Sequence, residues 1–208
     1  MKHYNLAEIK SKIDYDLKKQ LVSGKILLDR LAMIDESSRK SPSYVDPNYA
    51  GFYYHLGKYL APESLMEFGF DIGIFPASFM TSCKSVKKFI AFRENDGSYY
   101  SHRIGRKNIK KVFKGSSVYI NTYLHHAELD KIITNSLDMV IFCCEHKYDK
   151  QLERLDYVWQ YLSEDGIMLC ENLNKTKSVK DAFVAFCEGS NREPIFFNTR
   201  HGTGLVRK

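Results

Sequence analysis

The sequence predicts an α/β fold, in which a doubly wound, mostly parallel sheet of about seven strands carries helices on both faces. Three observations point to this class. From Leu65 onward, short apolar segments alternate with segments of helical periodicity. The first apolar segment leads into a turn with two glycines four residues apart, Gly69 and Gly73, and then into a helix. Two strand-like segments follow each other near the end of the chain, which predicts an antiparallel hairpin at one edge of the sheet.

Length and composition agree with a globular protein. The chain has 208 residues, which suits one domain or one domain with a short appendage. Apolar residues make up 44% and charged residues 27%, a balance that disordered chains do not have. No apolar run approaches the roughly 20 residues that span a bilayer, and the first residues lack the apolar core of a signal peptide. We therefore expect a cytoplasmic protein without a membrane partner.

The cysteines are expected to be buried free thiols. Most of them stand in apolar segments, and no two form a C-x-x-C pair. Their odd number argues against a complete set of disulfides, and the absence of ligand-spaced clusters argues against zinc. The five are Cys83, Cys143, Cys144, Cys170 and Cys187.

The N-terminal part of the chain is predicted to be helical. Apolar residues recur at helical spacing from Leu6 to Met33 with an interruption near Ser23-Gly24, so we expect two helices or one broken helix. The polar, proline-containing segment from Ser37 to Pro47 predicts a loop. The expected division is an N-terminal helical cap at residues 1–43 and an α/β domain at residues 44–208.

The remaining elements follow from the same periodicities. Predicted strands, all short and apolar, cover residues 65–68, 89–92, 118–120, 139–144, 167–170, 195–197 and 204–206. Predicted helices cover residues 50–60, 77–83, 104–113, 129–133, 152–162 and 179–187. Pro76 suits the first turn of a helix, because the N–H that it lacks would have no partner there. Asp165-Gly166 predicts a turn directly before the fifth strand.

Polar or reactive residues stand at the ends of five successive predicted strands. Because the carboxyl ends of parallel strands meet at one edge of a sheet, we expect these residues to line a single crevice. The alternative is that polar residues simply begin where strands end. The residues are Glu67 and Gly69, Arg93 and Glu94, Asn121, Cys143 to His146, and Glu171 with Asn172.

Three motifs occur in the order typical of one enzyme family. They are the glycine turn Glu67–Gly73, a block made of Asp138–Phe142, Glu145–Tyr148 and Leu162–Ile167, and the terminal segment Gly202–Val206. On these motifs, the chain from about Tyr44 to Lys208 resembles a divergent class I S-adenosylmethionine-dependent methyltransferase of the small-molecule or sugar O-methyltransferase kind. The resemblance implies a seven-stranded Rossmann-like sheet with a reversed last strand. It also implies S-adenosylmethionine as cofactor and a small hydroxylated molecule as methyl acceptor.

The resemblance further implies roles for single residues. Gly69 and Gly73 would let the backbone approach the cofactor, and Glu67 would anchor the turn. Asp71 stands where a third glycine is usual, and an aspartate adopts left-handed backbone angles more readily than most residues. Glu94 would accept hydrogen bonds from the ribose hydroxyls. The cofactor-binding candidates are Glu67, Gly69, Asp71, Gly73, Glu94, Asn121 beside the adenine, and Cys143.

A hydroxyl acceptor requires a base, and the candidate is His146, because the ordinary pKa of histidine is about 6.5. A helix-capping or exposed histidine is the alternative, and Glu145 is the second catalytic candidate. In metal-dependent family members, acidic residues after the fourth and fifth strands hold a divalent cation. Glu171-Asn172 match one half of that site, but Cys143 stands at the other, and a thiol is a poor ligand for magnesium. We therefore predict no metal site unless Glu145 substitutes.

Two other functions stay open. Departures from the family pattern at Asp71, Cys143-Cys144 and Asp165 also suit a catalytically inactive scaffold protein, whose crevice would be filled by Phe70, Asp71 or Phe75. The third function is a nucleic-acid methyltransferase, which rests on a basic helix alone.

The basic helix has cationic residues every three or four positions, and few aromatic residues are interleaved with them. A solvated helix face is the favoured interpretation, so a nucleic-acid partner is not expected. The N-terminal helices are expected to cover the acceptor or to form a homodimer contact. The basic residues are Arg103, Arg106, Lys107, Lys110, Lys111 and Lys114.

Overall fold

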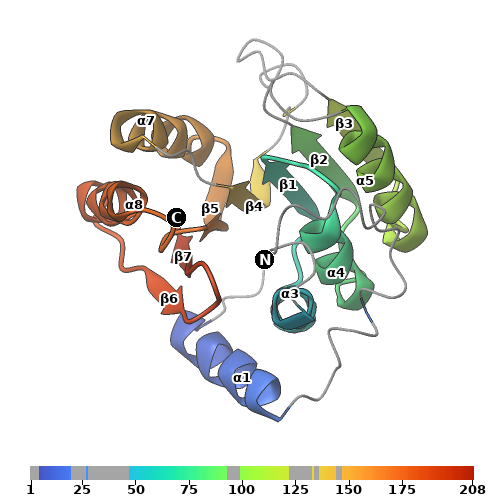
Figure 1. Cartoon of the computed structure of the whole chain (residues 1–208), viewed down its shortest axis with the longest axis horizontal. Helices are drawn as coiled ribbons and strands as arrows, with labels where there is room; N and C mark the ends of the chain where they lie inside the picture. The colour runs from blue at the N-terminus through green and yellow to red at the C-terminus, as the bar shows by residue number, and fades with distance from the viewer. Residues whose placement is uncertain are drawn as a thin grey trace.

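The computed structural model describes residues 5–19, 27, 47–92, 99–121, 133, 136–143 and 147–208. Within these residues, seven strands form one sheet with helices on both faces (Figure 1), which confirms the predicted α/β fold. The strands are β1 (Ser64–Phe68), β2 (Lys88–Phe92), β3 (Ser117–Asn121), β4 (Leu137–Cys143), β5 (Leu162–Glu171), β6 (Ile195–Phe197) and β7 (Thr203–Arg207). The helices are α1 (Leu6–Lys18), α3 (Pro47–Tyr59), α4 (Ile74–Ser82), α5 (Tyr99–Val112), α7 (Tyr148–Trp159) and α8 (Lys177–Gly189).

The strand order is β3-β2-β1-β4-β5-β7-β6. Strands β1 to β5 are parallel, and β7 runs antiparallel to both β5 and β6. The predicted hairpin is therefore confirmed, and its second strand lies inside the sheet. The chain moves from β1 out to β3 and then returns to β4 on the other side of β1. This reversal of strand order places a ligand crevice beyond the carboxyl ends of β1 and β4.

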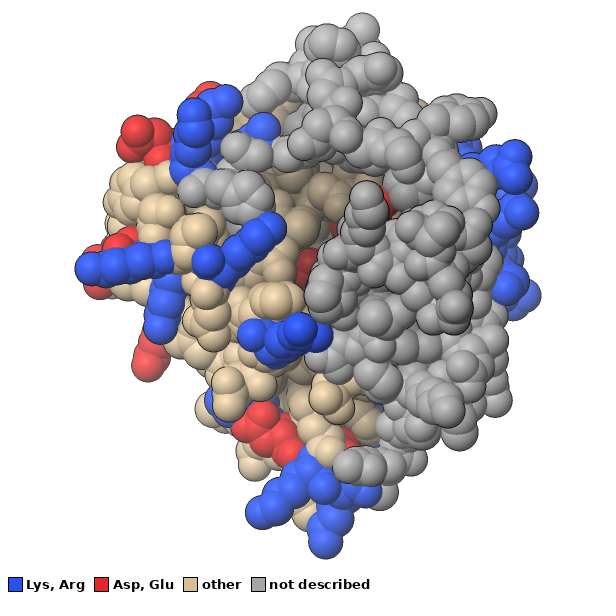
Figure 2. All heavy atoms as spheres, in the orientation of Figure 1, with Lys and Arg blue, Asp and Glu red and all other residues tan. Residues whose placement is uncertain are grey.

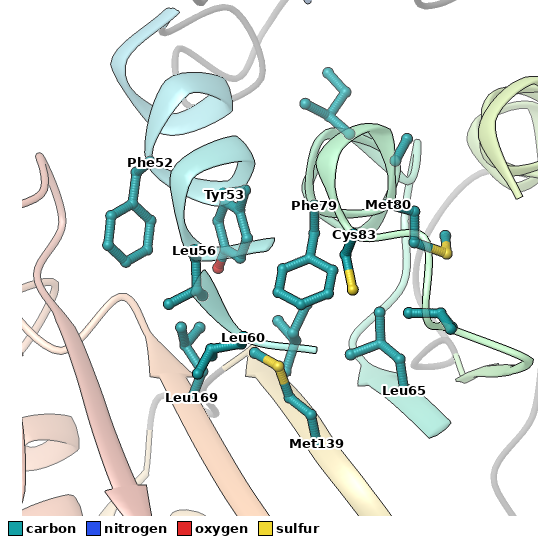
Figure 3. Close-up of a cluster of buried hydrophobic side chains, with 14 of the residues drawn as sticks. Phe52, Tyr53, Leu56, Leu60, Leu65, Phe79, Met80, Cys83, Met139 and Leu169 are labelled. Atoms are coloured by element: carbon teal, nitrogen blue, oxygen red, sulfur yellow. The ribbon is translucent and has the colours of Figure 1, made fainter. Parts of the chain in front are cut away.

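Alternate residues of each strand serve two separate cores. Leu65 of β1 belongs to the cluster that α3, α4 and α5 cover, whereas Met66 belongs to the cluster that α7 and α8 cover. Figure 3 shows part of the first cluster, in which Met139 of β4 lies below Leu56 of α3 and Phe79 of α4. The side chains at the ends of the strands also alternate between the two faces of the sheet. The face on which each side chain lies therefore decides which of these residues can contact one another.

Helix α3 is buried on almost every side. Residues 49–53 and 55–57 are all buried, as expected for a helix that packs against α1, α4 and the sheet. Gly57 allows the close approach to α4. A Cβ at this position would lie 2.3 Å from the carbonyl oxygen of Phe79 and 2.6 Å from Oγ of Ser82.

Substitution Gly57→Ala is expected to lower the free energy of unfolding by about 1–3 kcal/mol, because the two helices would have to separate. Alanine normally stabilises a helix interior over glycine by about 1 kcal/mol. Gly51→Ala is the matched control on the same helix, since its Cβ would meet only Cδ2 of Leu17 at 3.8 Å. Urea denaturation of both variants measures the difference. Equal free energies of unfolding for the two variants would contradict the expected overlap.

A buried carboxylate holds α1 against α3. Asp16 is 3% exposed and accepts hydrogen bonds from Nζ of Lys58 at 2.9 Å and from the hydroxyl of Tyr59 at 2.6 Å. Nδ1 of His55 lies 3.1 Å from the same carboxylate oxygen. Burial holds the pKa of His55 below its ordinary value. The contact is therefore both apolar, through Ile13 of α1, and polar.

Three expectations about local structure are wrong. Strand β5 begins at Leu162 and not at Ile167, and Asp165-Gly166 do not form a turn before it. They lie where the register between β4 and β5 shifts, because Leu137 pairs with Leu162 whereas Met139 already pairs with Ile167. Pro47 begins α3 and does not end a loop.

Some expectations cannot be compared with the structure. Most of the predicted helix at residues 129–133 and the interruption at Ser23-Gly24 lie outside the described residues. Among the helices that the structure describes, none is long and apolar enough to cross a membrane.

Candidate functional site

The glycine turn after β1 is tied to the neighbouring strand. The N–H groups of Gly69 and Phe70 both donate to the carbonyl oxygen of Phe92 at the end of β2, at 2.9 and 2.7 Å. Gly69 and Gly73 have φ values of 96° and 64°, which are left-handed values that favour glycine. Asp71 has no positive φ. An aspartate is therefore tolerated in the turn without left-handed backbone angles.

The glycines of the turn are required by the packing of the protein itself. A Cβ on Gly69 would lie 2.6 Å from Cβ of Cys143 at the end of β4. A Cβ on Gly73 would lie 2.8 Å from the ring of Phe70, which is fully buried beneath the turn. The role predicted for these glycines, close approach of the backbone to a ligand, stays a prediction.

Helix α5 supports the turn through two residues that the sequence did not single out. A Cβ on Gly105 would lie 2.5 Å from the carbonyl oxygen of Asp71 and 2.6 Å from the Phe70 ring. Nδ2 of the buried Asn108 donates to the carbonyl oxygen of Ile72 at 2.9 Å. The sequence feature that could have indicated this support is the presence of Gly105 and Asn108 in a helix whose other polar residues are mostly cationic.

A pocket of about 70 Å³ opens above this turn, at the carboxyl ends of β1, β4 and β5. Its walls combine apolar and aromatic side chains with a few polar groups, which is the usual composition of a small-molecule site. Because one pocket is lined from all three strands, the predicted meeting of their carboxyl ends is confirmed for β1, β4 and β5. The lining residues are Tyr49, Glu67, Gly69, Asp71, Ile72, Gly73, Ile74, Phe75, Cys143 and Asn172.

Glu67 is the buried acid of the pocket. Its side chain is 3% exposed, and its Oε2 has no hydrogen-bond partner within the part of the chain that the structure describes. Burial, with a smaller contribution from the negative charge of Asp71, raises the pKa of Glu67 to about 8. Near pH 7 the carboxyl is therefore mostly neutral, and a cation placed beside it would favour its ionisation.

A second buried acid lies at the end of β5. Glu171 accepts a hydrogen bond from the hydroxyl of Tyr53 on α3, and burial raises the pKa of Glu171 well above its ordinary value. The next residue, Asn172, has a φ of 59° and directs Nδ2 toward Sγ of Cys143 at 3.4 Å. Among the described residues, no group of three His, Cys, Asp or Glu side chains is arranged to hold a metal.

Aromatic residues of α3 and α4 form one wall of the pocket. Phe75 stacks on Tyr53 with ring centroids 4.9 Å apart and lies 5.7 Å from the ring of Tyr49. The hydroxyl of Tyr49 accepts a hydrogen bond from the backbone N–H of His201 at 2.8 Å, which fixes the ring between α3 and the C-terminal hairpin. Sequence reasoning missed Tyr49 and Tyr53, because they precede β1 and belong to no motif.

The predicted site residues divide into two groups. The structure brings together Glu67, Gly69, Asp71, Gly73 and Cys143 around one pocket. The others cannot be placed: Glu94, Glu145 and His146 lie outside the described residues, and so does the side chain of Asn121, whose backbone ends β3. Their catalytic and cofactor-binding roles stay predictions.

Solved methyltransferase structures, two of them O-methyltransferases, have the same fold. The O-methyltransferase from Bacillus cereus in complex with SAH superposes with a TM-score of 0.67 and 13% identity, over 96% of this chain and 100% of that one. The O-methyltransferase TomG from Streptomyces achromogenes, in complex with SAM, gives 0.66 and 9% identity over 99% of both chains. SAH-bound PaMTH1 from Podospora anserina gives 0.64 and 12% identity, over 100% of this chain and 97% of that one.

The class I methyltransferase fold that the sequence predicts is thereby confirmed along nearly the whole chain. Comparisons with protein-family models and with curated protein sequences give no match. Such low identities to solved structures fit a divergent sequence on this fold.

Proposed function

We propose that the chain is an S-adenosylmethionine-dependent methyltransferase that acts on a small hydroxylated acceptor. The observation that carries the proposal is the buried Glu67 carboxyl, which faces the pocket with an oxygen that no described residue satisfies. S-adenosylmethionine carries positive charge on its amino group and on its sulfonium, and a carboxylate in an apolar pocket favours a buried cation. Complexes of SAM and SAH with proteins of the same fold support this choice of cofactor.

Each part of the pocket has a role in this proposal. Gly69, Asp71 and Gly73 would bind the cofactor beside Glu67, and Tyr49 with Phe75 would exclude water from the reacting atoms. The cofactor supplies the methyl group for an in-line displacement, and the protein contributes mainly alignment.

The remaining roles rest on the sequence. His146, assisted by Glu145, is assigned to take the proton of the acceptor hydroxyl. Glu94 and Asn121 are assigned to the ribose and the adenine. The small acceptor and the cytoplasmic location belong to the same proposal.

The alternative is a catalytically inactive scaffold protein, and this hypothesis predicts that side chains fill the crevice. Phe70 instead packs against Phe89, Gly73 and Gly105, and it does not line the pocket. Asp71 and Phe75 form walls of the pocket and leave space between them. These positions favour a protein that binds a ligand.

Calorimetry with S-adenosylmethionine and S-adenosylhomocysteine tests the proposal. Wild-type protein is expected to bind both. Gly69→Ala should weaken binding by roughly tenfold or more, because a left-handed alanine facing Cys143 costs about 1–3 kcal/mol of strain, which the free protein relieves by moving the turn that lines the pocket. Gly189→Ala is the control, since nothing lies within 4 Å of its Cβ position. Wild-type protein that gives neither heat nor a thermal shift at millimolar ligand would refute the proposal and leave the scaffold.

A further inference from the structure

All of the formal net charge of the chain is carried by one segment. Residues 97–127 contain six of the 31 Lys and Arg residues and none of the 25 Asp and Glu residues. The rest of the chain, with 25 basic and 25 acidic residues, is formally neutral, and the total of +6 arises from this segment alone. Helix α5 lies within it.

Between Arg103 and Lys111, the exposed face of α5 is uniformly cationic. From Arg103 to Lys111 the exposed residues are Arg103, Arg106, Lys107, Lys110 and Lys111, and the others are buried. Arg103, Lys107 and Lys110 follow the i, i+4, i+7 spacing of one helix face and extend about 10 Å along the axis. Lys114 is exposed just beyond the helix. Figure 2 shows blue side chains gathered at the edge of the molecule where Figure 1 places α5.

Three of these lysines have no acidic ion-pair partner in the part of the chain that the structure describes. Lys107, Lys110 and Lys114 take part in no ion pair among the described residues, and α4 and β3 contain no acidic residue. On α1, by contrast, Lys10 and Lys12 each pair with an acid one helical turn away. Like charges at this spacing destabilise a helix, so the α5 face favours an external partner of opposite charge.

We infer that the cationic face of α5 docks on the phosphate backbone of a nucleic-acid duplex. A duplex strand presents a regular row of negative charges, which complements a row of lysines without interspersed acids. The exposed residues between Arg103 and Lys111 are all Lys or Arg, so the contacts that they make are to phosphates and are independent of sequence.

A membrane surface fits this face less well. Amphipathic helices that bind lipid insert an apolar face beside their basic residues. Of the apolar residues between Arg103 and Val112, Ile104 and Ile109 are buried in the core and Val112 packs half-buried against it, so they are not available for insertion.

The docking face and the pocket are separate. No residue of α5 lines the pocket, so duplex binding does not depend on the proposed methyl transfer. The inference therefore stands or falls independently of cofactor binding.

The test is fluorescence anisotropy with a labelled mixed-sequence duplex of about 20 base pairs. We expect affinity to fall roughly 100-fold between about 50 and 200 mM salt, as for four phosphate contacts. The variant K107E/K110E/K114E should bind at least roughly tenfold more weakly and show a shallower salt dependence. Both variant and wild type should keep the same melting temperature and the same cofactor affinity.

The matched control is K18E/K150E/K177E, which makes the same change of net charge on α1, α7 and α8. Its affinity for the duplex is expected to stay within a few-fold of wild type. Equal losses in the two variants would overturn the inference, because net charge alone would then explain binding. The inference would also be overturned if the protein did not bind the duplex at low salt, or if it bound a single strand more tightly than the duplex. It would be overturned as well if polyglutamate or anionic vesicles displaced the labelled duplex as effectively as unlabelled duplex does.

Discussion

Substitution Glu67→Gln is expected to stabilise the protein at alkaline pH. The pKa of Glu67 is about 8 in the folded protein because of burial, and it returns to about 4.5 on unfolding. The folded state therefore binds more protons between these values, and the free energy of unfolding falls as pH rises through this window. This loss in the free energy of unfolding, which comes from ionising the buried carboxyl, is absent below about pH 4.5. It is complete above about pH 8, where it reaches at most about 5 kcal/mol.

Urea denaturation near pH 5 and near pH 9 measures this effect. The variant should gain a few kcal/mol relative to wild type between the two conditions. Glu63→Gln is the matched control, because Glu63 is exposed and pairs with Lys87 at the surface. Parallel pH profiles for wild type and Glu67→Gln would show that the buried carboxyl does not titrate in this range.

The same substitution should weaken cofactor binding. If the carboxylate of Glu67 pairs with the cationic cofactor, wild-type protein releases a proton on binding at pH 7, and its affinity rises between about pH 6 and pH 8. The variant should bind more weakly and without this pH dependence. Calorimetry in buffers of different ionisation enthalpy measures the proton released, and a binding heat that is independent of buffer would contradict the pairing.

Substitution Gly105→Ala is expected to be the second large effect. Its Cβ would lie 2.5 Å from the carbonyl oxygen of Asp71, so α5 or the glycine turn must move, at a cost of about 1–3 kcal/mol. The expected sign is opposite to the gain of about 1 kcal/mol that alanine brings to an unconstrained helix. Cofactor affinity should fall as well, because the displaced segment forms the pocket.

Thermal and urea denaturation of Gly105→Ala, with Gly189→Ala as control, check this expectation. The control has open space at its Cβ position and should not be destabilised. A stabilised Gly105→Ala variant with unchanged cofactor affinity would mean that α5 and the turn can separate without consequence.

The strands were within reach of sequence reasoning because they depend on local signals, whereas their order in the sheet was not predicted. The apolar segment before Glu67 predicts a strand, and the glycines after it predict a turn that leads into a helix. The register shift in β5 was not predictable, because Asp165-Gly166 has the same signature in a turn and in an irregular strand. Only the pairing with β4 distinguishes the two.

The candidate site was predictable only where one short segment builds it. Glu67, Gly69 and Gly73 could be named from the turn alone, whereas Tyr53 meets Glu171 across 118 positions of the chain. The position of the Phe70 ring could not be predicted either, because the space that it occupies depends on Gly105 in another helix. Contacts between distant segments leave no periodicity in the sequence.

The burial of α3 limits how the pocket can change during evolution or in the laboratory. One face of α3 holds Asp16 of α1 through Lys58 and Tyr59, and another supplies Tyr49 and Tyr53 to the pocket wall and its support. Few positions of the helix are free to accept a new side chain. Libraries designed to alter the pocket should therefore randomise α1 and α3 together, since the substitutions that one helix tolerates will depend on the other.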